Sequence, residues 1–296
     1  MSRMNNVWKP WHGRGVSLVC ALAMTACGAA SEADGDSMGE MASPVDQTSL
    51  IQLWSQGTPA FGIFVPSEGE RGARGPDGER LPPIHTSAGG AQHGANPILD
   101  YLFLNLEGSY NVEAVAAIAE GMASVDSPLT LLVRIPPISA DGADAARSRV
   151  AEAIAAGADG IVMPHVRSPE EARQAVSFFS EYDVWSPMNP EGTVLVMLMI
   201  EDPGALEAAQ EIADVPGYSV LACGIGSLSA ALGDRVAGEA GNMVVLDHAI
   251  RVGLPDMITA NSDDVAQRIE EGFLGLLMNG PEADAHIAVG RAAAGR

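Results

Sequence analysis

The feature that most constrains the fold is a regular alternation between short apolar runs and amphipathic helical stretches, from about residue 49 to the C-terminus. Continuous apolar runs of this length are typical of strands that are covered on both faces, as the strands of a parallel sheet are. The chain contains eight such runs. They are Phe61–Val65, Tyr101–Asn105, Leu129–Arg134, Gly160–Pro164, Val194–Ile200, Ser219–Cys223, Asp256–Ala260 and Phe273–Met278.

Helical patterns separate the runs. Residues Ala143–Ala156 end at a glycine, and Ser168–Ser180 begins with Ser-Pro-Glu-Glu, which is typical of a helix N-terminus. Eight strands that alternate with helices over roughly 245 residues predict an α/β fold, a (β/α)8 TIM barrel that spans 49–296. A doubly wound open sheet is the alternative, but no run is followed by a glycine-rich phosphate-binding motif.

Residues 67–97 interrupt the alternation at the place where a helix is expected after the first strand. The segment is rich in glycine and proline, and a loop of this length in a compact domain is either functional or disordered. After a barrel strand it would leave the C-terminal face, where active sites lie. Two interpretations follow: a cover for the substrate or a contact between subunits, and a mobile excursion.

The first 26 residues have the pattern of an export signal. Arg3, Lys9 and Arg14 precede the apolar run Val16–Ala26, which is too short to cross the roughly 30 Å of hydrocarbon as a helix. A basic flank, a short apolar segment and small residues at its end are typical of a signal peptide. The letters MTAC at 24–27 resemble the lipobox of a bacterial lipoprotein.

This pattern predicts that Cys27 is acylated and becomes the N-terminus of the mature protein. An ordinary cleavage site and a wrongly assigned start codon are the alternatives. Residues 27–48 are small and acidic, which predicts a flexible tether. Gly28 stands where an acid would favour inner-membrane retention, so the outer membrane is favoured. We therefore expect a bacterial cell-envelope protein that faces the periplasm and contacts the membrane only through its lipid.

The net charge excludes two classes of partner. The chain carries 38 acids against 16 bases, a formal charge of −22. Its first 31 residues hold three of the bases and no acid, so the remainder carries 13 bases against 38 acids, or −25. Such a chain cannot neutralise nucleic-acid phosphates in bulk, and it cannot hold anionic lipid through a polybasic patch.

Three segments resemble the HpcH/HpaI aldolase/citrate lyase family: Leu129–Pro136, Ala156–Val176 and Val196–Gly233. The strongest matches are the glutamate that closes the fifth apolar run and the x-G-x-x-x-L-S-x-x-L-G stretch after the sixth. The resemblance extends from about residue 60 to 280. It implies a TIM barrel that uses a divalent metal to make or break a carbon–carbon bond beside a 2-oxo acid, or that acts on citryl- and malyl-type thioesters.

The resemblance also implies site residues. Glu201 takes the place of a metal-binding carboxylate, Arg134 that of a substrate-contacting arginine, and Glu107 that of the glutamate in an Asp-x-Glu-His motif. The chemistry accounts for these residue types, because Mg²⁺, Mn²⁺ or Co²⁺ can stabilise an enolate as a Lewis acid and an arginine adds fixed positive charge beside it. A helix cap at Glu201 and a buried Arg134–Glu107 pair are the structural alternatives.

Three positions depart from the family pattern. The aspartate and histidine of the motif are Asn105 and Gly108 here, and the second metal carboxylate is Ser227. A single carboxylate is a poor anchor for Mg²⁺. His165, after the fourth run, is a candidate base or ligand, with a structural rim histidine as the alternative. Asp202 adjoins the metal glutamate, but neighbours on a strand point to opposite faces, so Asp202 is expected to cap the next helix.

Two functions compete at this point. The first is aldolase- or lyase-like cleavage or formation of a carbon–carbon bond in a small 2-oxo or hydroxy acid, with Arg134, Glu107 and His165 as catalytic candidates and Glu201 as the metal ligand. The second is an organic-acid-binding barrel of the cell envelope that has lost turnover, which the departures at Ser227 and Gly108 favour. A scaffold in a periplasmic complex is a third, weaker interpretation. The resemblance further implies a homo-oligomer, either a trimer or a hexamer.

Overall fold

The computed structural model describes residues 49–69, 73–78 and 81–296, and its centre is a set of eight parallel strands. Each strand lies within two residues of its predicted bounds, so the eight apolar runs are confirmed as strands. The strands are β1 Ala60–Phe64, β2 Tyr101–Asn105, β3 Thr130–Arg134, β4 Gly160–Met163, β5 Leu195–Ile200, β6 Val220–Cys223, β7 Met257–Thr259 and β8 Gly275–Met278.

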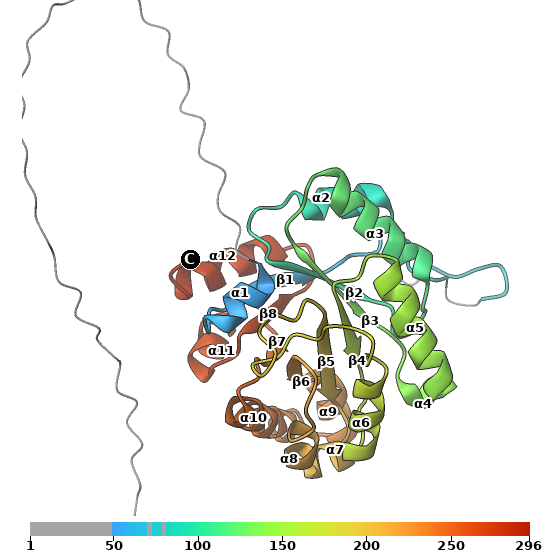
Figure 1. Cartoon of the computed structure of the whole chain (residues 1–296). Helices are drawn as coiled ribbons and strands as arrows, with labels where there is room; N and C mark the ends of the chain where they lie inside the picture. The colour runs from blue at the N-terminus through green and yellow to red at the C-terminus, as the bar shows by residue number, and fades with distance from the viewer. Residues whose placement is uncertain (1–48, 70–72, 79–80) are drawn as a thin grey trace, which may run out of the picture. The chain divides into compact units, whose positions relative to one another are not determined.

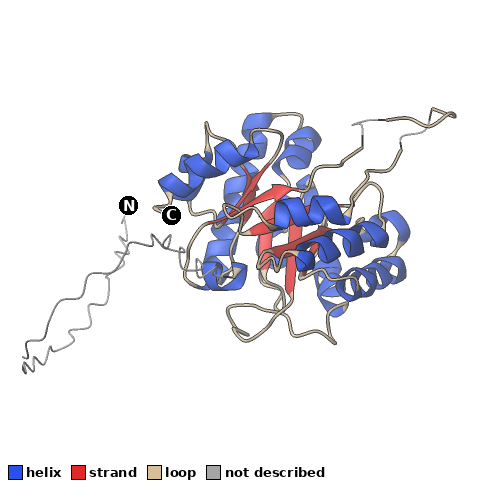
Figure 2. Ribbon diagram, turned by 90° about the horizontal axis from the view of Figure 1, so that it is seen from above, coloured by secondary structure: helices blue, strands red, loops and turns tan. Residues whose placement is uncertain are grey.

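The sheet curls into a nearly closed barrel. Its strand order is β6-β5-β4-β3-β2-β1-β8-β7, so each strand pairs with its sequence neighbour and β1 also pairs with β8. The remaining gap lies between β6 and β7, where the Leu221 N–H donates to the Pro255 carbonyl at 3.3 Å. Seen from above, the strands occupy the centre and the helices surround them (Figure 2). The predicted (β/α)8 barrel is confirmed.

Twelve helices are present in the described ranges, mostly one or two after each strand (Figure 1). None of them is both long enough and apolar enough to cross a membrane. They are α1 Leu50–Ser55, α2 Ser87–Gly94, α3 Val112–Ser124, α4 Ile138–Asp141, α5 Ala143–Ala155, α6 Pro169–Ser177, α7 Pro203–Glu207, α8 Ala209–Ala213, α9 Ile225–Leu232, α10 Arg235–Val252, α11 Val265–Glu271 and α12 Ala283–Ala293.

The barrel interior is filled at one end and left partly open at the other. Alternate strand residues point inward, as a period of two requires. Tyr101 fits in the interior because its neighbour Gly62 has no side chain; a Cβ at Gly62 would lie 2.3 Å from the Tyr101 ring. Leu50, Leu53 and Trp54 of α1 belong to the same buried cluster. Since the Trp54 Nε1–H donates to the carbonyl just before β8, α1 covers the N-terminal end of the strands. A site therefore belongs at the C-terminal end.

One prediction about residues 67–97 is wrong, because the segment contains helix α2 beside α3 (Figure 1). Its glycines serve close packing: a Cβ on Gly90 would lie 2.4 Å from the Ile118 carbonyl, and one on Gly121 would lie 2.0 Å from the Ser87 carbonyl. Composition indicated a loop, whereas the glycines let two helices approach each other. The predicted signal segment, Cys27 and the tether lie outside the described residues.

Candidate active site

Four residues named from the sequence converge at the C-terminal rim of the barrel. Arg134 ends β3, Glu201 follows β5, and Glu107 and His165 lie in the segments after β2 and β4. Met197 and Met199 of β5 face the barrel interior, and the alternation carries the side chain of Glu201 to the same side. Because parallel strands all end at one rim, residues far apart in the sequence meet there.

Arg134 is the centre of the ion-pair network. Its Nη2 lies 2.8 Å from Glu201 Oε2 and 2.9 Å from Glu107 Oε2. Arg134 is 9% exposed and Glu201 only 1% exposed, so each charge depends on the other for its stabilisation. The expected Arg134–Glu107 pair is therefore present, and it coexists with the contact to Glu201.

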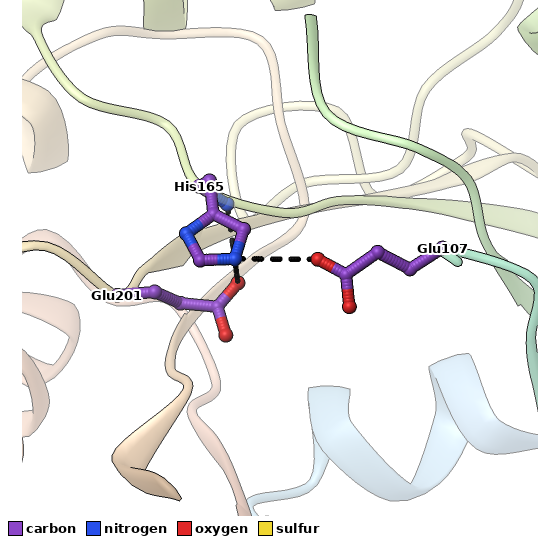
Figure 3. A group of neighbouring side chains, drawn as sticks. All are labelled: Glu107, His165 and Glu201. Carbon is purple, nitrogen blue, oxygen red and sulfur yellow. Dashed lines mark hydrogen bonds and ion pairs between the residues drawn. The ribbon is translucent and has the colours of Figure 1, made fainter. Parts of the chain in front are cut away.

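His165 reaches the same carboxylates from β4. Its backbone N–H donates to Glu201 Oε2 at 3.1 Å, while its Nε2 lies 3.3 Å from Glu107 Oε1 and 3.7 Å from Glu201 Oε2 (Figure 3). The backbone of His165 has φ 51°, a left-handed conformation that non-glycine residues rarely adopt. Such a conformation persists only where surrounding contacts hold it, and the bond to Glu201 is one of them.

The role expected for Asp202 is wrong in part. Asp202 does occupy the N-cap position of α7, but its side chain makes no capping hydrogen bond. Its Oδ2 instead lies 3.1 Å from Nδ1 of His165. The two residues follow neighbouring strands, β4 and β5, and beyond a strand end the alternation of side chains no longer applies. The adjacent acids at 201–202, together with a histidine after the previous strand, were the available signal.

A cavity of about 210 Å³ opens beside the Arg134–Glu201 pair. A Cβ on Gly224 would lie 2.0 Å from Glu201 Oε1, so the position of that carboxylate requires glycine. Helix α9 begins at this wall, where its first N–H groups have no acceptor in their own helix. The remaining lining is mainly apolar. It includes Phe64, Phe103, Met197, Met199, Ala222, Met257 and Leu277.

The three departures from the family pattern add no charge to the site. Asn105 accepts a hydrogen bond from the Glu107 N–H at 3.2 Å and so shapes the turn after β2. Gly108 has no atoms near the place of a side chain. Ser227 lines the cavity from the first turn of α9, on the same wall as Glu201. A second carboxylate at Ser227 is thus absent, although the position itself faces the cavity.

The described residues do contain a different set of potential metal ligands. Glu107, His165 and Glu201 each offer one ligand atom, and these atoms all lie within 4.8 Å of one another. Two carboxylates and an imidazole are a donor set that divalent cations accept in proteins. The site therefore fits a metal ion through Glu201, the predicted metal ligand, through His165, predicted as a base or ligand, and through Glu107, which was predicted only as a catalytic residue.

Cys223, the one cysteine among the described residues, is not a candidate nucleophile of this site. Cys223 points to the outer layer of the core, between the barrel and the helices, and is 4% exposed. Burial raises the pKa of the Cys223 thiol, and the carboxylates of Asp256 and Glu201 raise it further. A buried thiol that stays protonated is a poor nucleophile.

Comparison with known proteins identifies the family and the fold. The model of the HpcH/HpaI aldolase/citrate lyase family matches residues 95–268. An HpcH/HpaI aldolase/citrate lyase family protein from Burkholderia cenocepacia J2315 superposes with a TM-score of 0.62 and 20% identity, over 82% of this chain and 96% of that chain. An HpcH/HpaI aldolase from Desulfitobacterium hafniense DCB-2 gives a TM-score of 0.60 and 19% identity, over 82% and 95%.

A third solved structure carries ligands. It is a citrate lyase beta subunit from M. tuberculosis, complexed with oxaloacetate and magnesium, with a TM-score of 0.53 and 18% identity over 80% of this chain and 97% of that chain. None of the curated proteins compared with the sequence matches it. At these identities the structures show the fold, whereas the family model spans more than half of the chain. The chain therefore belongs to the HpcH/HpaI aldolase/citrate lyase family.

Proposed function

We propose that this barrel makes or breaks a carbon–carbon bond in a small 2-oxo or hydroxy acid through an enolate. The observation that carries the proposal is the buried Arg134–Glu201 pair, which borders a cavity at the C-terminal end of the strands. Active sites of TIM barrels lie at this end. A citrate lyase beta subunit with the same fold was solved with a 2-oxo acid and magnesium, which supports this class of chemistry.

The size of the cavity favours a small substrate. Its volume of about 210 Å³ is below the roughly 300–1,000 Å³ of pockets that hold drug-sized ligands. The N-terminus of α9, at Ile225, Gly226 and Ser227, presents unpaired N–H groups to it. Such a helix end stabilises an anion, so we assign the substrate carboxylate to it.

Arg134 has the position that enolate formation requires. Its guanidinium lines the cavity and is held in place by two carboxylates, so no reorganisation is needed when negative charge develops on the substrate oxygen. The reaction also moves a proton. Glu107 and His165 are rim groups that can carry one, since Oε1 and Nε2 lie 3.3 Å apart.

Glu201 is assigned to a divalent cation, Mg²⁺, Mn²⁺ or Co²⁺. When bound, such an ion supplies Lewis-acid stabilisation to the enolate oxygen. Glu201 suits this task because its carboxylate is held by Arg134, by the His165 N–H and by close contact with Gly224. Ser227, at the second carboxylate position of the family, contributes no ligand of that kind.

The test follows proton exchange. The protein is incubated with pyruvate and Mg²⁺, Mn²⁺ or Co²⁺ in D₂O, and loss of the methyl proton signal is followed by NMR. We expect exchange that Glu201→Ala abolishes. The alternative function is an organic-acid-binding barrel. It would be supported if no metal gives exchange while calorimetry detects binding of an organic acid and Arg134→Ala removes that binding.

We also propose that the protein is anchored in the cell envelope through a lipid on Cys27 and that it assembles as a trimer or hexamer. The lipobox-like sequence supports the anchor, and the family resemblance supports the assembly. Cys27→Ser should increase the mass of the mature chain, because the signal is no longer removed, and should change its membrane fractionation. Light scattering on the purified protein measures the assembly; a monomer would contradict it.

A further inference from the structure

We infer that Glu107, His165 and Glu201 together form the metal site of this chain, and that the site takes a transition-metal ion in preference to Mg²⁺. In this arrangement an imidazole replaces the carboxylate that is absent at Ser227. The inference rests on the proposed function for the purpose of the metal, and it assigns Glu107 and His165 to metal binding instead of proton transfer. Its geometry and its test are independent of turnover.

The distances between the candidate ligand atoms fit a shared ion. His165 Nε2 lies 3.3 Å from Glu107 Oε1 and 3.7 Å from Glu201 Oε2 (Figure 3). Two ligands that each bind a metal at about 2.1 Å lie roughly 3.0 to 3.5 Å apart, depending on the coordination angle. The three side chains thus already stand close to the spacing of a coordination shell, and small shifts of their ends complete it.

Both ring nitrogens of His165 face carboxylate oxygens. Nδ1 lies 3.1 Å from Asp202 Oδ2, and Nε2 faces the carboxylate oxygens of Glu107 and Glu201. A neutral imidazole has a single N–H. In either tautomer the ring nitrogen without hydrogen would therefore direct its lone pair at a carboxylate. A cation on Nε2 removes this conflict, with the Nδ1–H donated to Asp202.

The net charge of the site also favours a bound cation. Two carboxylates, those of Glu107 and Glu201, contact the buried cation Arg134, while Asp202 contacts His165 and faces the charge of Arg167. With neutral His165, the two glutamates and Arg134 together carry one net negative charge, and Glu201 among them is 1% exposed. Buried charges are tolerated when they are paired or bind metals. A divalent ion bound between the two glutamates and His165 offsets this negative charge.

The ligand types decide which ion is favoured. Mg²⁺ prefers oxygen ligands, while imidazole suits zinc, copper, iron and nickel and the affinity for divalent ions rises from Mn²⁺ through Co²⁺. Asp202 completes the arrangement, because metal-binding histidines commonly donate their other N–H to a carboxylate that fixes the ring. The pair His165–Asp202 therefore has the form of a ligand with its supporting residue.

The experiment titrates the full-length protein with Co²⁺, Mn²⁺ and Mg²⁺ separately, without substrate, by calorimetry and, for Co²⁺, by visible absorption. We expect one bound Co²⁺ per chain and weaker binding of Mg²⁺. Asparagine tolerates the left-handed backbone, so His165→Asn tests the ligand with little strain and should weaken Co²⁺ binding more than 100-fold. Asp202→Asn should weaken it about 10- to 100-fold, as loss of a supporting residue does.

His248→Asn on α10 serves as the matched control and should leave Co²⁺ binding unchanged. The inference would be overturned if the wild type bound Mg²⁺ and Co²⁺ with equal affinity and His165→Asn changed neither affinity. So would a wild-type protein that shows no Co²⁺ binding by calorimetry or by visible absorption. If Co²⁺ binds as expected but pyruvate exchange is absent, the proposed function fails and the metal site stands. If exchange occurs and His165→Asn does not change it, the proposed function stands and the metal site fails.

Discussion

Arg134 Nη2 and Glu201 Oε2 lie 2.8 Å apart, and this contact joins the C-terminal ends of β3 and β5 across the barrel mouth. Both side chains are almost fully shielded from water. In such surroundings neither charge is stable without the other, because the hydration that each has lost is replaced only by its partner. The pair therefore links the stability of the barrel to the chemistry of its site.

Replacing only the arginine should be costly. We expect Arg134→Met to lower the free energy of unfolding by about 3–5 kcal/mol, since it leaves the Glu201 carboxylate buried and poorly compensated. The double variant Arg134→Met/Glu201→Leu should be more stable than Arg134→Met alone, although inactive. Urea denaturation measures both. The exposed Arg173–Glu170 pair provides the control, because Arg173→Met should cost under about 1 kcal/mol. Equal costs at the two arginines would refute this account.

The position of Glu201 should depend on a single glycine. Gly224→Ala places a methyl group 2.0 Å from the present position of Glu201 Oε1 and forces the carboxylate to move. A displacement of about 1 Å at a reacting centre can cost about 100-fold in rate, so we expect a loss of pyruvate exchange of that order. Gly204→Ala, at the start of α7 and outside the cavity lining, meets no atom within 4 Å and should retain exchange. Similar exchange rates for the two alanine variants would show that Glu201 tolerates displacement.

Restoring the family carboxylate should change metal preference. Ser227 faces the cavity from the first turn of α9, where an acidic side chain is also favourable to the helix. We therefore expect Ser227→Asp to raise Mg²⁺ affinity at least tenfold, a change of about 1.4 kcal/mol measured by calorimetry. Ser227→Asn has nearly the same size without the charge and serves as the control. An equal gain with asparagine would mean that charge at this position is not the cause.

A buried acid remote from the site should control the pH dependence of stability. Asp256 precedes β7 and is 1% exposed. Burial raises the pKa of Asp256 well above its ordinary value of 3.8, and neither carboxylate oxygen has a hydrogen-bond partner among the described residues. Because the folded pKa exceeds the unfolded pKa, the stability contribution of Asp256 is fully present below pH 3.8 and is lost as pH rises through the folded pKa.

Asp256→Asn removes that titration. The variant should therefore gain stability relative to the wild type as pH rises above 4, by up to about 1.4 kcal/mol per pH unit within the titration window. Denaturant unfolding between pH 4 and pH 8 measures the difference. Asp247→Asn, at an exposed position on α10, should give a constant difference over the same range. If the free energy of unfolding of Asp256→Asn and of the wild type changed with pH in parallel, this role for Asp256 would be excluded.

Much of the fold was predictable because its main signal is local. Eight continuous apolar runs marked the strands to within two residues, since a strand covered on both faces needs apolar side chains on each. Helix α2 was missed for an equally local reason. Glycines usually indicate loops, and only the contact between α2 and α3 shows that Gly90 and Gly121 allow close packing.

The candidate site, like the fold, was predictable only where the signal was local in the sequence. The sequence alone determined that Arg134 and Glu201 end parallel strands, and parallel strands bring such residues to one rim. The contact of Asp202 with His165, and the set of ligand atoms that His165 completes, were decided only by the tertiary structure. Side-chain direction is periodic within a strand, but past its end it depends on backbone angles such as the φ of 51° at His165, and those angles are set by contacts between segments distant in the sequence.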